Sequence, residues 1–496
     1  MFRIALLALL SLAAVPARAE RCADVLARIG SRLVDATCVA SADLTTNNPA
    51  TTPKDNSITS LPGGAFTPKT DPVVITPGPG NRTPITKVVP GIQIDGWLAS
   101  DPSREARFLL RLPDDWNGKL VVAGASGTRS EFNGDLAWSD FVIQKGYAYA
   151  SQNKGVLNLR VVSVTSANPP EPLACRVNPT SLSKVWVHFY DNDPEKPFWE
   201  WQFRIVEAAR LAKRGVEARY DEEPSRTYAV GTSNGGYQVR RALELAPGVF
   251  DGGVDWEGTE VDSKHFNLLT DLPPAVKNFP AYVASDYNPL SDAAKAIEAA
   301  GYPPDIVKRK LDGSVATSLW AKYYGAYWEV TACQWQKRLD SGYDTYGSGL
   351  GNYDYRARAQ VSPVAANLAL FETSGRIHAP LITLAGTLDA LLPIRHNARA
   401  YADKVAAASA GGEGEDDEDR PQYRLFEVQN GNHIETYKES IPELEYIQPH
   451  AQKAFDLLVD AVENGNELPP DQCIGRGGAI ADEPAQPGRC AELLVK

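Results

Sequence analysis

Segments with the pattern of strands and segments with the pattern of amphipathic helices alternate along the central part of this chain. Residues 119–123 form a continuous apolar run, as a strand buried on both faces does, and further strands are expected at residues 147–152, 226–230 and 250–256. Residues 198–220 and 237–245 instead place apolar side chains at helical spacing, as amphipathic helices do. Strands that alternate with helices form a parallel sheet with helices on both faces. The pattern therefore predicts an α/β fold.

The rest of the chain divides around this core. Four further strands are expected, at residues 91–99, 106–112, 380–385 and 423–428. Residues 20–40 suggest one short helix, and residues 41–90 are rich in Thr, Pro, Asn and Gly. We therefore expect residues 20–90 to form an extended N-terminal arm. The core is predicted at residues 91–258 and 380–496, the second part ending in a C-terminal tail.

A long aromatic segment interrupts the core. The strand and helix pattern stops for roughly 120 residues, which is too long for a simple connection, so residues 259–379 are expected to form an inserted lid. Ten aromatic residues lie between Trp320 and Tyr355. Aromatic side chains suit either a substrate wall or a small helical core. We expect Trp320, Tyr327 and Trp328 to contact a substrate and most of the others to pack.

The first 19 residues resemble a secretory signal peptide. They contain Arg3, an apolar stretch and the small-residue cleavage sequence Ala17-Arg18-Ala19. Only about 12 apolar residues are available, which is too few to span a bilayer. We expect residues 1–19 to be removed, and the mature protein to be secreted or periplasmic without a membrane anchor.

Composition and charge narrow the possible partners. The chain has 496 residues, of which 43% are hydrophobic, enough to bury a large core. Its net charge of -12 argues against nucleic acid as a partner, because nucleic acid is itself a polyanion.

The cysteines point to disulfides rather than to a metal site. There are six, an even number for an oxidising compartment, and none has CxxC spacing. The sequence cannot choose among the possible pairings, but the local hypothesis is Cys22 with Cys38, Cys473 with Cys490, and therefore Cys175 with Cys333. No metal and no cofactor are expected.

One turn has the pattern of a catalytic serine. Residues 231–236 read Gly-Thr-Ser-Asn-Gly-Gly and stand between a predicted strand and a predicted helix. In this context a G-x-S-x-G sequence is typical of a nucleophile elbow, which holds its serine in a strained conformation above the sheet. Gly231 and Gly235 are needed where a Cβ would clash with backbone. The alternative is an ordinary glycine-rich turn, but we interpret Ser233 as a nucleophile.

A second small-residue loop, at residues 124–128, follows the strand at 119–123. In enzymes with a nucleophile elbow, such a loop supplies one N–H group of the oxyanion hole, and the residue after the nucleophile supplies another. We expect Ala125 or Ser126, together with Asn234, to take these roles. A plain turn between a strand and a helix would have the same composition.

Two later residues complete a predicted triad. A serine hydroxyl needs an imidazole to accept its proton and a carboxylate to orient that imidazole. Asp389 and His433 each follow a predicted strand, so both should lie with Ser233 at one edge of the sheet. The order Ser, Asp, His is that of α/β-hydrolases. Asp255 and Glu257 are rival acids, but they follow the elbow too closely to be preferred.

Several short sequences together carry a family resemblance. They are Trp116-Asn117-Gly118-Lys119-Leu120, the loop 124–127, the segment 146–151, the elbow and the long insertion. Over roughly residues 110–450, the chain resembles the tannase and feruloyl esterase family of secreted α/β-hydrolases. The resemblance implies a lidded α/β-hydrolase fold that cleaves esters with Ser233, His433 and Asp389.

The elbow region also differs from that family. The family usually joins a cysteine beside the nucleophile to one beside the histidine, whereas this chain has Thr232 and either Ile434 or Asn432 there. The family's lid calcium has no clear ligand run in this sequence. The Ser-Asn-Gly-Gly elbow is also similar to that of secreted 3-hydroxybutyrate oligomer hydrolases, which implies short aliphatic polyesters as substrates.

These features predict a secreted serine esterase that acts on aromatic-acid esters or on short hydroxyalkanoate oligomers. A peptidase with the same triad stays open, because His433 can protonate an amine leaving group. A non-catalytic polymer-binding protein with an aromatic platform stays open as well. The sequence determines neither the acyl and alcohol parts of the substrate nor the oligomeric state.

Overall fold

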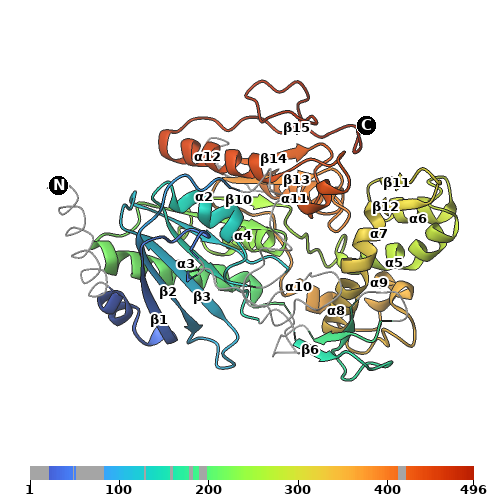
Figure 1. The fold of residues 1–496 in the computed structure, drawn as a ribbon, viewed down its shortest axis with the longest axis horizontal. Coiled ribbons are helices and arrows are strands. Elements are labelled where there is room, and N and C mark those ends of the chain that lie inside the picture. The colour runs from blue at the N-terminus through green and yellow to red at the C-terminus, as the bar shows by residue number, and fades with distance from the viewer. Residues whose placement is uncertain are drawn as a thin grey trace.

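The structure is a computed structural model, in which one large sheet is flanked by helices and carries a helical insertion at one end (Figure 1). It describes residues 22–48, 50–51, 83–127, 130–156, 160–177, 183–188, 198–410 and 421–496. The predicted signal peptide at residues 1–19 lies outside this part of the chain.

Ten strands form the central sheet, in the order β1-β2-β3-β5-β4-β9-β10-β13-β14-β15. Their bounds are β1 (Leu33–Ser41), β2 (Gly91–Leu98), β3 (Arg107–Pro113), β4 (Lys119–Ala123), β5 (Ala148–Gln152), β9 (Arg226–Thr232), β10 (Gly252–Trp256), β13 (Leu381–Gly386), β14 (Tyr423–Val428) and β15 (Gln472–Ile474). Strands β1, β2, β3 and β5 pair antiparallel, and every pair from β5 through β4 to β15 is parallel. The carboxyl ends of the parallel strands therefore meet at one edge.

Helices cover both faces of this sheet. The main ones are α2 (Asp140–Ile143), α3 (Trp201–Tyr220), α4 (Asn234–Leu245), α11 (Ala398–Ala410) and α12 (Gln448–Asn464). Within β4, Leu120 and Val122 belong to the apolar cluster with α3, α4 and α11, whereas Val121 and Ala123 belong to the cluster with α2 and α12. Because successive strand side chains point to opposite faces, burial on both faces requires a continuous apolar run. The predicted α/β-hydrolase fold class is confirmed.

The N-terminal region differs from the predicted extended arm. Residues 22–29 are helical, but β1 then joins the sheet as its edge strand, antiparallel to β2 from Leu33 to Ser41. Residues 33–41 therefore belong to the sheet, and residues 52–82 of the predicted arm lie outside the described part of the chain. This strand is hard to recognise in the sequence because one of its faces is partly buried and the other is exposed, so it lacks a continuous apolar run.

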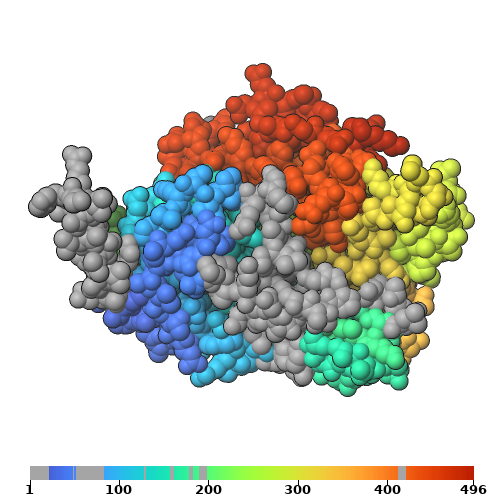
Figure 2. All heavy atoms as spheres, viewed as in Figure 1, coloured from blue at the N-terminus to red at the C-terminus, as the bar shows by residue number. Residues whose placement is uncertain are grey.

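The residues between β10 and β13 form a mainly helical insertion. Its elements are α5 (Leu268–Ala284), α6 (Asp292–Ala299), β11 (Val307–Arg309), β12 (Val315–Ser318), α7 (Leu319–Tyr323), a π-helical turn (Tyr324–Trp328), α8 (Glu329–Leu339), α9 (Tyr355–Arg358) and α10 (Val364–Ala369). Its apolar cluster continues into Leu388, Ala390 and Ile434 of the core. In the space-filling view, the yellow insertion lies directly against the orange C-terminal half of the core (Figure 2). The insertion is thus packed onto the loops that leave β13 and β14.

All three predicted disulfides are present. Cys22 pairs with Cys38, Cys175 with Cys333, and Cys473 with Cys490. Cys175 belongs to a small antiparallel sheet of β6 (Arg160–Ser163), β7 (Cys175–Arg176) and β8 (Trp186–His188), so its disulfide ties this sheet to α8 of the insertion. Among the described helices, none is both long and apolar enough to cross a bilayer.

The long-range disulfide should stabilise the protein most. Replacing Cys175 and Cys333 with serine opens a loop of 158 residues, whereas replacing Cys22 and Cys38 opens a loop of 16. Chain entropy alone predicts a difference of about 2 kcal/mol between the two losses of stability. Thermal unfolding of both double variants at one scan rate measures the two losses of stability. A loss in the Cys22/Cys38 variant that equals or exceeds the loss in the Cys175/Cys333 variant would contradict the prediction.

Candidate active site

Ser233 lies in a strained turn between β9 and α4. Its backbone has φ 60° and ψ -125°, a conformation that residues with a Cβ rarely adopt. The Ser233 N–H donates to the carbonyl of Trp256 at 2.8 Å, and its own carbonyl accepts the Tyr237 N–H at 3.0 Å. Hydrogen bonds on both sides therefore hold the serine in the geometry of a nucleophile elbow.

Two glycines allow this turn to form. A Cβ on Gly231 would lie 2.2 Å from the carbonyl oxygen of Gly235, and a Cβ on Gly235 would lie 2.6 Å from that of Gly124. Strand β9, the first turn of α4 and the loop after β4 therefore touch through bare backbone. The structure confirms the predicted reason for glycine at positions 231 and 235.

His433 is held by a buried carboxylate. The His433 Nδ1 atom lies 2.7 Å from Oδ2 of Asp389, and these two side chains come from the loops after β14 and β13. The other oxygen of Asp389 accepts the N–H groups of Leu391 and Leu392, each at 2.7 Å. Three donors thus surround Asp389, which is 1% exposed.

A second carboxyl group faces the same imidazole. Oε2 of Glu257 lies 3.5 Å from His433 Nδ1, and its Oε1 accepts the Gly386 N–H at 3.0 Å. Glu257 follows β10 directly, at the carboxyl edge of the sheet. The sequence favoured Asp389 as the triad acid because Glu257 follows the elbow too closely along the chain. Separation along the chain, however, does not give the distance between residues at the ends of neighbouring parallel strands.

Burial controls the protonation of Glu257. Burial raises the pKa of its carboxyl well above the ordinary value, and the negative charges of Asp389 and Glu435 raise it further. The Gly386 N–H and the Trp256 indole act in the opposite direction. Glu257, Asp389 and His433 are also the one group with metal-ligand atoms clustered within 4.8 Å among the described residues. We interpret the cluster as a hydrogen-bonded acid and imidazole group because His433 and Asp389 already bind each other.

The insertion holds the loops that carry the acid and the histidine. The Tyr323 hydroxyl donates to Oδ1 of Asn432 at 2.6 Å and accepts the Ile434 N–H at 3.2 Å, so it binds both neighbours of His433. The Trp328 indole N–H donates to the carbonyl of Ala390, next to Asp389, at 2.6 Å. Burial raises the pKa of Tyr323, so its hydroxyl stays protonated and can donate.

These contacts change the role expected for the aromatic segment. Trp320 and Trp328 are 1% and 0% exposed, and the Trp320 indole donates to the carbonyl of Pro303 at 3.0 Å. Both tryptophans therefore belong to the core of the insertion instead of contacting a substrate as predicted. Tyr327 is half-buried, with its ring 5.8 Å from that of Tyr323, and stays a predicted contact. The sequence shows that these residues are aromatic, but it does not show which of them pack in the core of the insertion and which stay partly exposed.

The amides expected to form the oxyanion hole have different surroundings. Asn234 is the first residue of α4, where an N–H group has no helical carbonyl to bind. The Ala125 N–H, however, donates to Oε1 of Gln238 at 2.9 Å, and the Ser126 N–H donates to Oδ1 of Asn133 at 2.7 Å. In this arrangement, neither amide of the loop is available to an oxyanion. The sequence did not reveal Gln238 and Asn133 as their partners.

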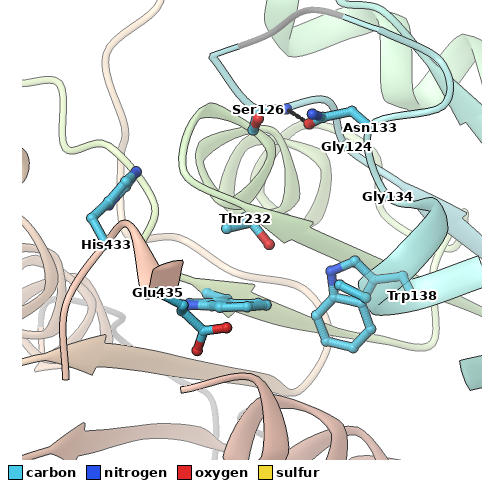
Figure 3. Close-up of a pocket in the computed structure, with 10 residues that line it drawn as sticks. Gly124, Ser126, Asn133, Gly134, Trp138, Thr232, His433 and Glu435 are labelled. Atoms are coloured by element: carbon cyan, nitrogen blue, oxygen red, sulfur yellow. Dashed lines mark hydrogen bonds between the residues drawn. The ribbon is translucent and has the colours of Figure 1, made fainter. Parts of the chain in front are cut away.

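A small cavity lies beside His433. Its volume is about 40 Å³, and its walls include Trp138, Thr232, Trp256, His433 and Glu435. Thr232, which precedes Ser233, lies between His433 and Trp138, and the indole nitrogen of Trp138 points into the cavity (Figure 3). That N–H has no acceptor among the described residues. The elbow and the histidine loop therefore border one narrow space with aromatic walls and a free donor.

Comparison with known proteins finds similarity to ester hydrolases. The family model for 3HB-oligomer hydrolase matches residues 321–487. A D-(-)-3-hydroxybutyrate oligomer hydrolase from Burkholderia cenocepacia (strain HI2424) is 31% identical over 128 residues, which are 24% of this chain and 17% of that protein. The chain thus aligns with about a sixth of that relative's length.

A solved structure agrees with the fold. An esterase from Aspergillus oryzae has a TM-score of 0.52 at 15% identity, and the match covers 90% of each chain. Feruloyl esterase B from the same organism has a TM-score of 0.48 at 13% identity, again over 90% of each chain. The match to the family model and the likeness to the first of these esterases confirm the resemblance predicted from the sequence, and that esterase, at a TM-score of 0.52, supports the α/β-hydrolase fold.

The Tyr323 hydroxyl should matter for stability. In Tyr323→Phe, the buried Ile434 N–H and the Asn432 side chain each lose a partner, so the free energy of unfolding should fall by about 1–3 kcal/mol. Tyr343→Phe is a suitable control, because its half-buried hydroxyl binds only the carbonyl of Gly349 within the insertion. Urea unfolding measures both variants, and equal losses would show that the contact with the histidine loop adds nothing.

Proposed function

We propose that this protein is a serine hydrolase that cleaves carboxylic esters through Ser233, His433 and Asp389. One observation carries the proposal: a strained serine follows Thr232, which borders the same cavity as His433, and His433 is bound to buried Asp389. A strained serine, an imidazole and a carboxylate are the groups that acyl transfer needs. The match to the 3HB-oligomer hydrolase model supports the same reaction class.

The proposed reaction proceeds in two steps. His433 accepts the proton of the Ser233 hydroxyl as its oxygen attacks the acyl carbon, and it then protonates the leaving alcohol. Water next attacks the acyl-enzyme with His433 again as the base, which releases the acid and restores Ser233. Asp389 orients the imidazole through Nδ1 and stabilises its charged form, because it lies 2.7 Å away and is itself held by backbone N–H groups.

The oxyanion of the tetrahedral intermediate needs hydrogen-bond donors. We assign the first donor to the Asn234 N–H, since it follows the nucleophile and begins α4. Ala125 or Ser126 can contribute a second donor only by exchanging its present partner, Gln238 or Asn133. Substrate binding is therefore proposed to rearrange this loop.

The cavity favours a short acyl group. A dry protein cavity that holds a benzene ring has a volume of about 150 Å³, well above the 40 Å³ beside His433. A ferulate or gallate ring is therefore too large for this space as it stands, whereas a hydroxybutyrate unit is small and flexible. The family match and the cavity together support short hydroxyalkanoate oligomers as the substrate.

Export from the cytoplasm is part of the proposal. The signal sequence at residues 1–19 predicts it, and three disulfides are typical of proteins from oxidising compartments.

A peptidase is the second candidate, because the same three residues can cleave amides. Parallel assays with nitrophenyl esters and peptide amides separate the two activities. A polymer-binding protein is less well supported, since Trp320 and Trp328 of the proposed aromatic platform are buried.

Replacing the nucleophile tests the proposed reaction. Ser233→Ala should lower kcat/KM for nitrophenyl butyrate by at least about 10⁴-fold, because the acyl-enzyme cannot form. A fluorophosphonate probe should label the unaltered protein on Ser233 and fail to label the variant, as mass spectrometry of the peptide would show. Unchanged melting temperature serves as the folding control. Full activity in the variant, or no adduct on the unaltered protein, would exclude this mechanism.

Trp138 should help to select the acyl group. Its free indole N–H in the cavity wall can donate to the hydroxyl of a 3-hydroxybutyryl group, and Trp138→Phe removes that donor while keeping an aromatic wall. We expect the ratio of kcat/KM for 3-hydroxybutyryl over butyryl esters to fall about 5- to 10-fold. Steady-state assays with both esters, beside ferulate and gallate esters, measure the ratio. The same ratio in the variant would place the acyl group elsewhere.

A further inference from the structure

We propose that Glu257 is a second carboxyl partner of His433, able to take over the hydrogen bond to Nδ1 when Asp389 cannot make it. The inference rests on the proposed triad and concerns a residue outside it. In this role Glu257 is a positioning residue, because it acts on His433 and not on the substrate.

The geometry places two carboxyl groups on one imidazole nitrogen. His433 Nδ1 lies 2.7 Å from Asp389 Oδ2 and 3.5 Å from Glu257 Oε2, so the N–H can bind either oxygen after a small rotation of the ring. Oε2 of Glu257 makes no hydrogen bond of ordinary geometry within the described part of the chain. The atom nearest to the imidazole is thus the one left available.

Glu257 is held in place independently of His433. Its N–H donates to the carbonyl of Leu384 at 2.7 Å, and its Oε1 accepts the Gly386 N–H at 3.0 Å. Both partners belong to β13, the strand that leads to Asp389. The side chain therefore stays beside the imidazole when Asp389 is altered.

The two carboxyl groups differ in the number of hydrogen bonds that they accept. Asp389 has three donors around it, the N–H groups of Leu391 and Leu392 and the imidazole, whereas Glu257 has one good donor in Gly386. Two buried carboxylates at one site repel each other, so one proton stays on the pair. Burial and the neighbouring charge of Asp389 raise the pKa of Glu257, so its carboxyl group holds that proton.

The remaining groups that face Glu257 act on it in opposite directions, because Glu435 raises its pKa and the Trp256 indole lowers it. Glu435 adds a negative charge from the histidine loop, and the Tyr323 hydroxyl approaches from the insertion. Burial is the largest cause of the raised pKa of Glu257, and this cause persists after Asp389 is replaced. An enzyme that depends on Glu257 as its only acid must therefore work at higher pH than one that uses Asp389.

The test compares Asp389→Asn with the double variant Asp389→Asn/Glu257→Gln. We expect Asp389→Asn to lower kcat/KM by about 10²- to 10³-fold, less than the roughly 10⁴-fold typical when a triad acid becomes an amide. The acidic limb of its pH profile should move to higher pH. In the double variant, kcat/KM should fall at least another tenfold. The acidic limb that reports ionisation of Glu257 should be absent from its pH profile. The Glu257→Gln change keeps a side-chain oxygen for the Gly386 N–H, so a merely structural Glu257 would produce neither change.

Asp389→Asn/Glu260→Gln is the matched control. Glu260 is a buried carboxylate three residues further on, but it binds Lys404, Arg240 and Thr373 away from His433. This control should keep the rate and the pH profile of Asp389→Asn. Melting temperatures identify any variant that fails to fold.

A measurement without substrate separates this inference from the proposed function. Nuclear magnetic resonance titration of His433 should show its pKa falling by at least about one pH unit from Asp389→Asn to the double variant, because the last nearby carboxylate is gone. Equal titration curves, or equal rates and pH profiles, would overturn the role of Glu257. If the fluorophosphonate probe does not label Ser233 in the unaltered protein, the proposed function is overturned. The titration of His433 remains valid in that case, because it does not depend on catalysis.

Discussion

The close approach of three backbone segments at the elbow is the constraint on which the site depends. Gly231, Gly235 and Gly124 bring β9, the start of α4 and the loop after β4 into contact where any side chain would clash. This contact puts Ser233 in its strained conformation and sets the Asn234 N–H at the start of the helix. The strain is sustained by the buried sheet on one side and α4 on the other.

The insertion holds the loops that carry His433 and Asp389 in place. Tyr323 and Trp328 bind backbone or side-chain groups next to His433 and Asp389, and the apolar cluster of the insertion includes residues of both loops. Loops at a sheet edge have few backbone partners of their own, so side chains from another unit must fix them. The relative positions of the imidazole and its acid thus depend on the aromatic packing of a segment far from both in sequence.

Electrostatics around His433 follow from the parallel sheet. Neighbouring strands β10 and β13 end at the same edge, so Glu257 and Asp389 converge on one nitrogen although they are distant in the chain. Because this edge of the sheet is buried, one charged carboxyl group costs much less free energy there than two. The two carboxyl groups differ in their donors: the N–H groups of Leu391 and Leu392 bind Asp389, whereas that of Gly386 binds Glu257.

The sequence by itself determined the features that depend on local pattern. Continuous apolar runs identified the parallel strands, glycine spacing identified the elbow, and the even set of cysteines led to the three observed pairs. The tertiary structure alone decided the burial of Trp320 and Trp328, the edge strand β1, the partners of the Ala125 and Ser126 amides, and the approach of Glu257 to His433. The physical reason is that periodicity reports which face of an element is buried, whereas contacts across strands and between loops depend on how distant segments are brought together.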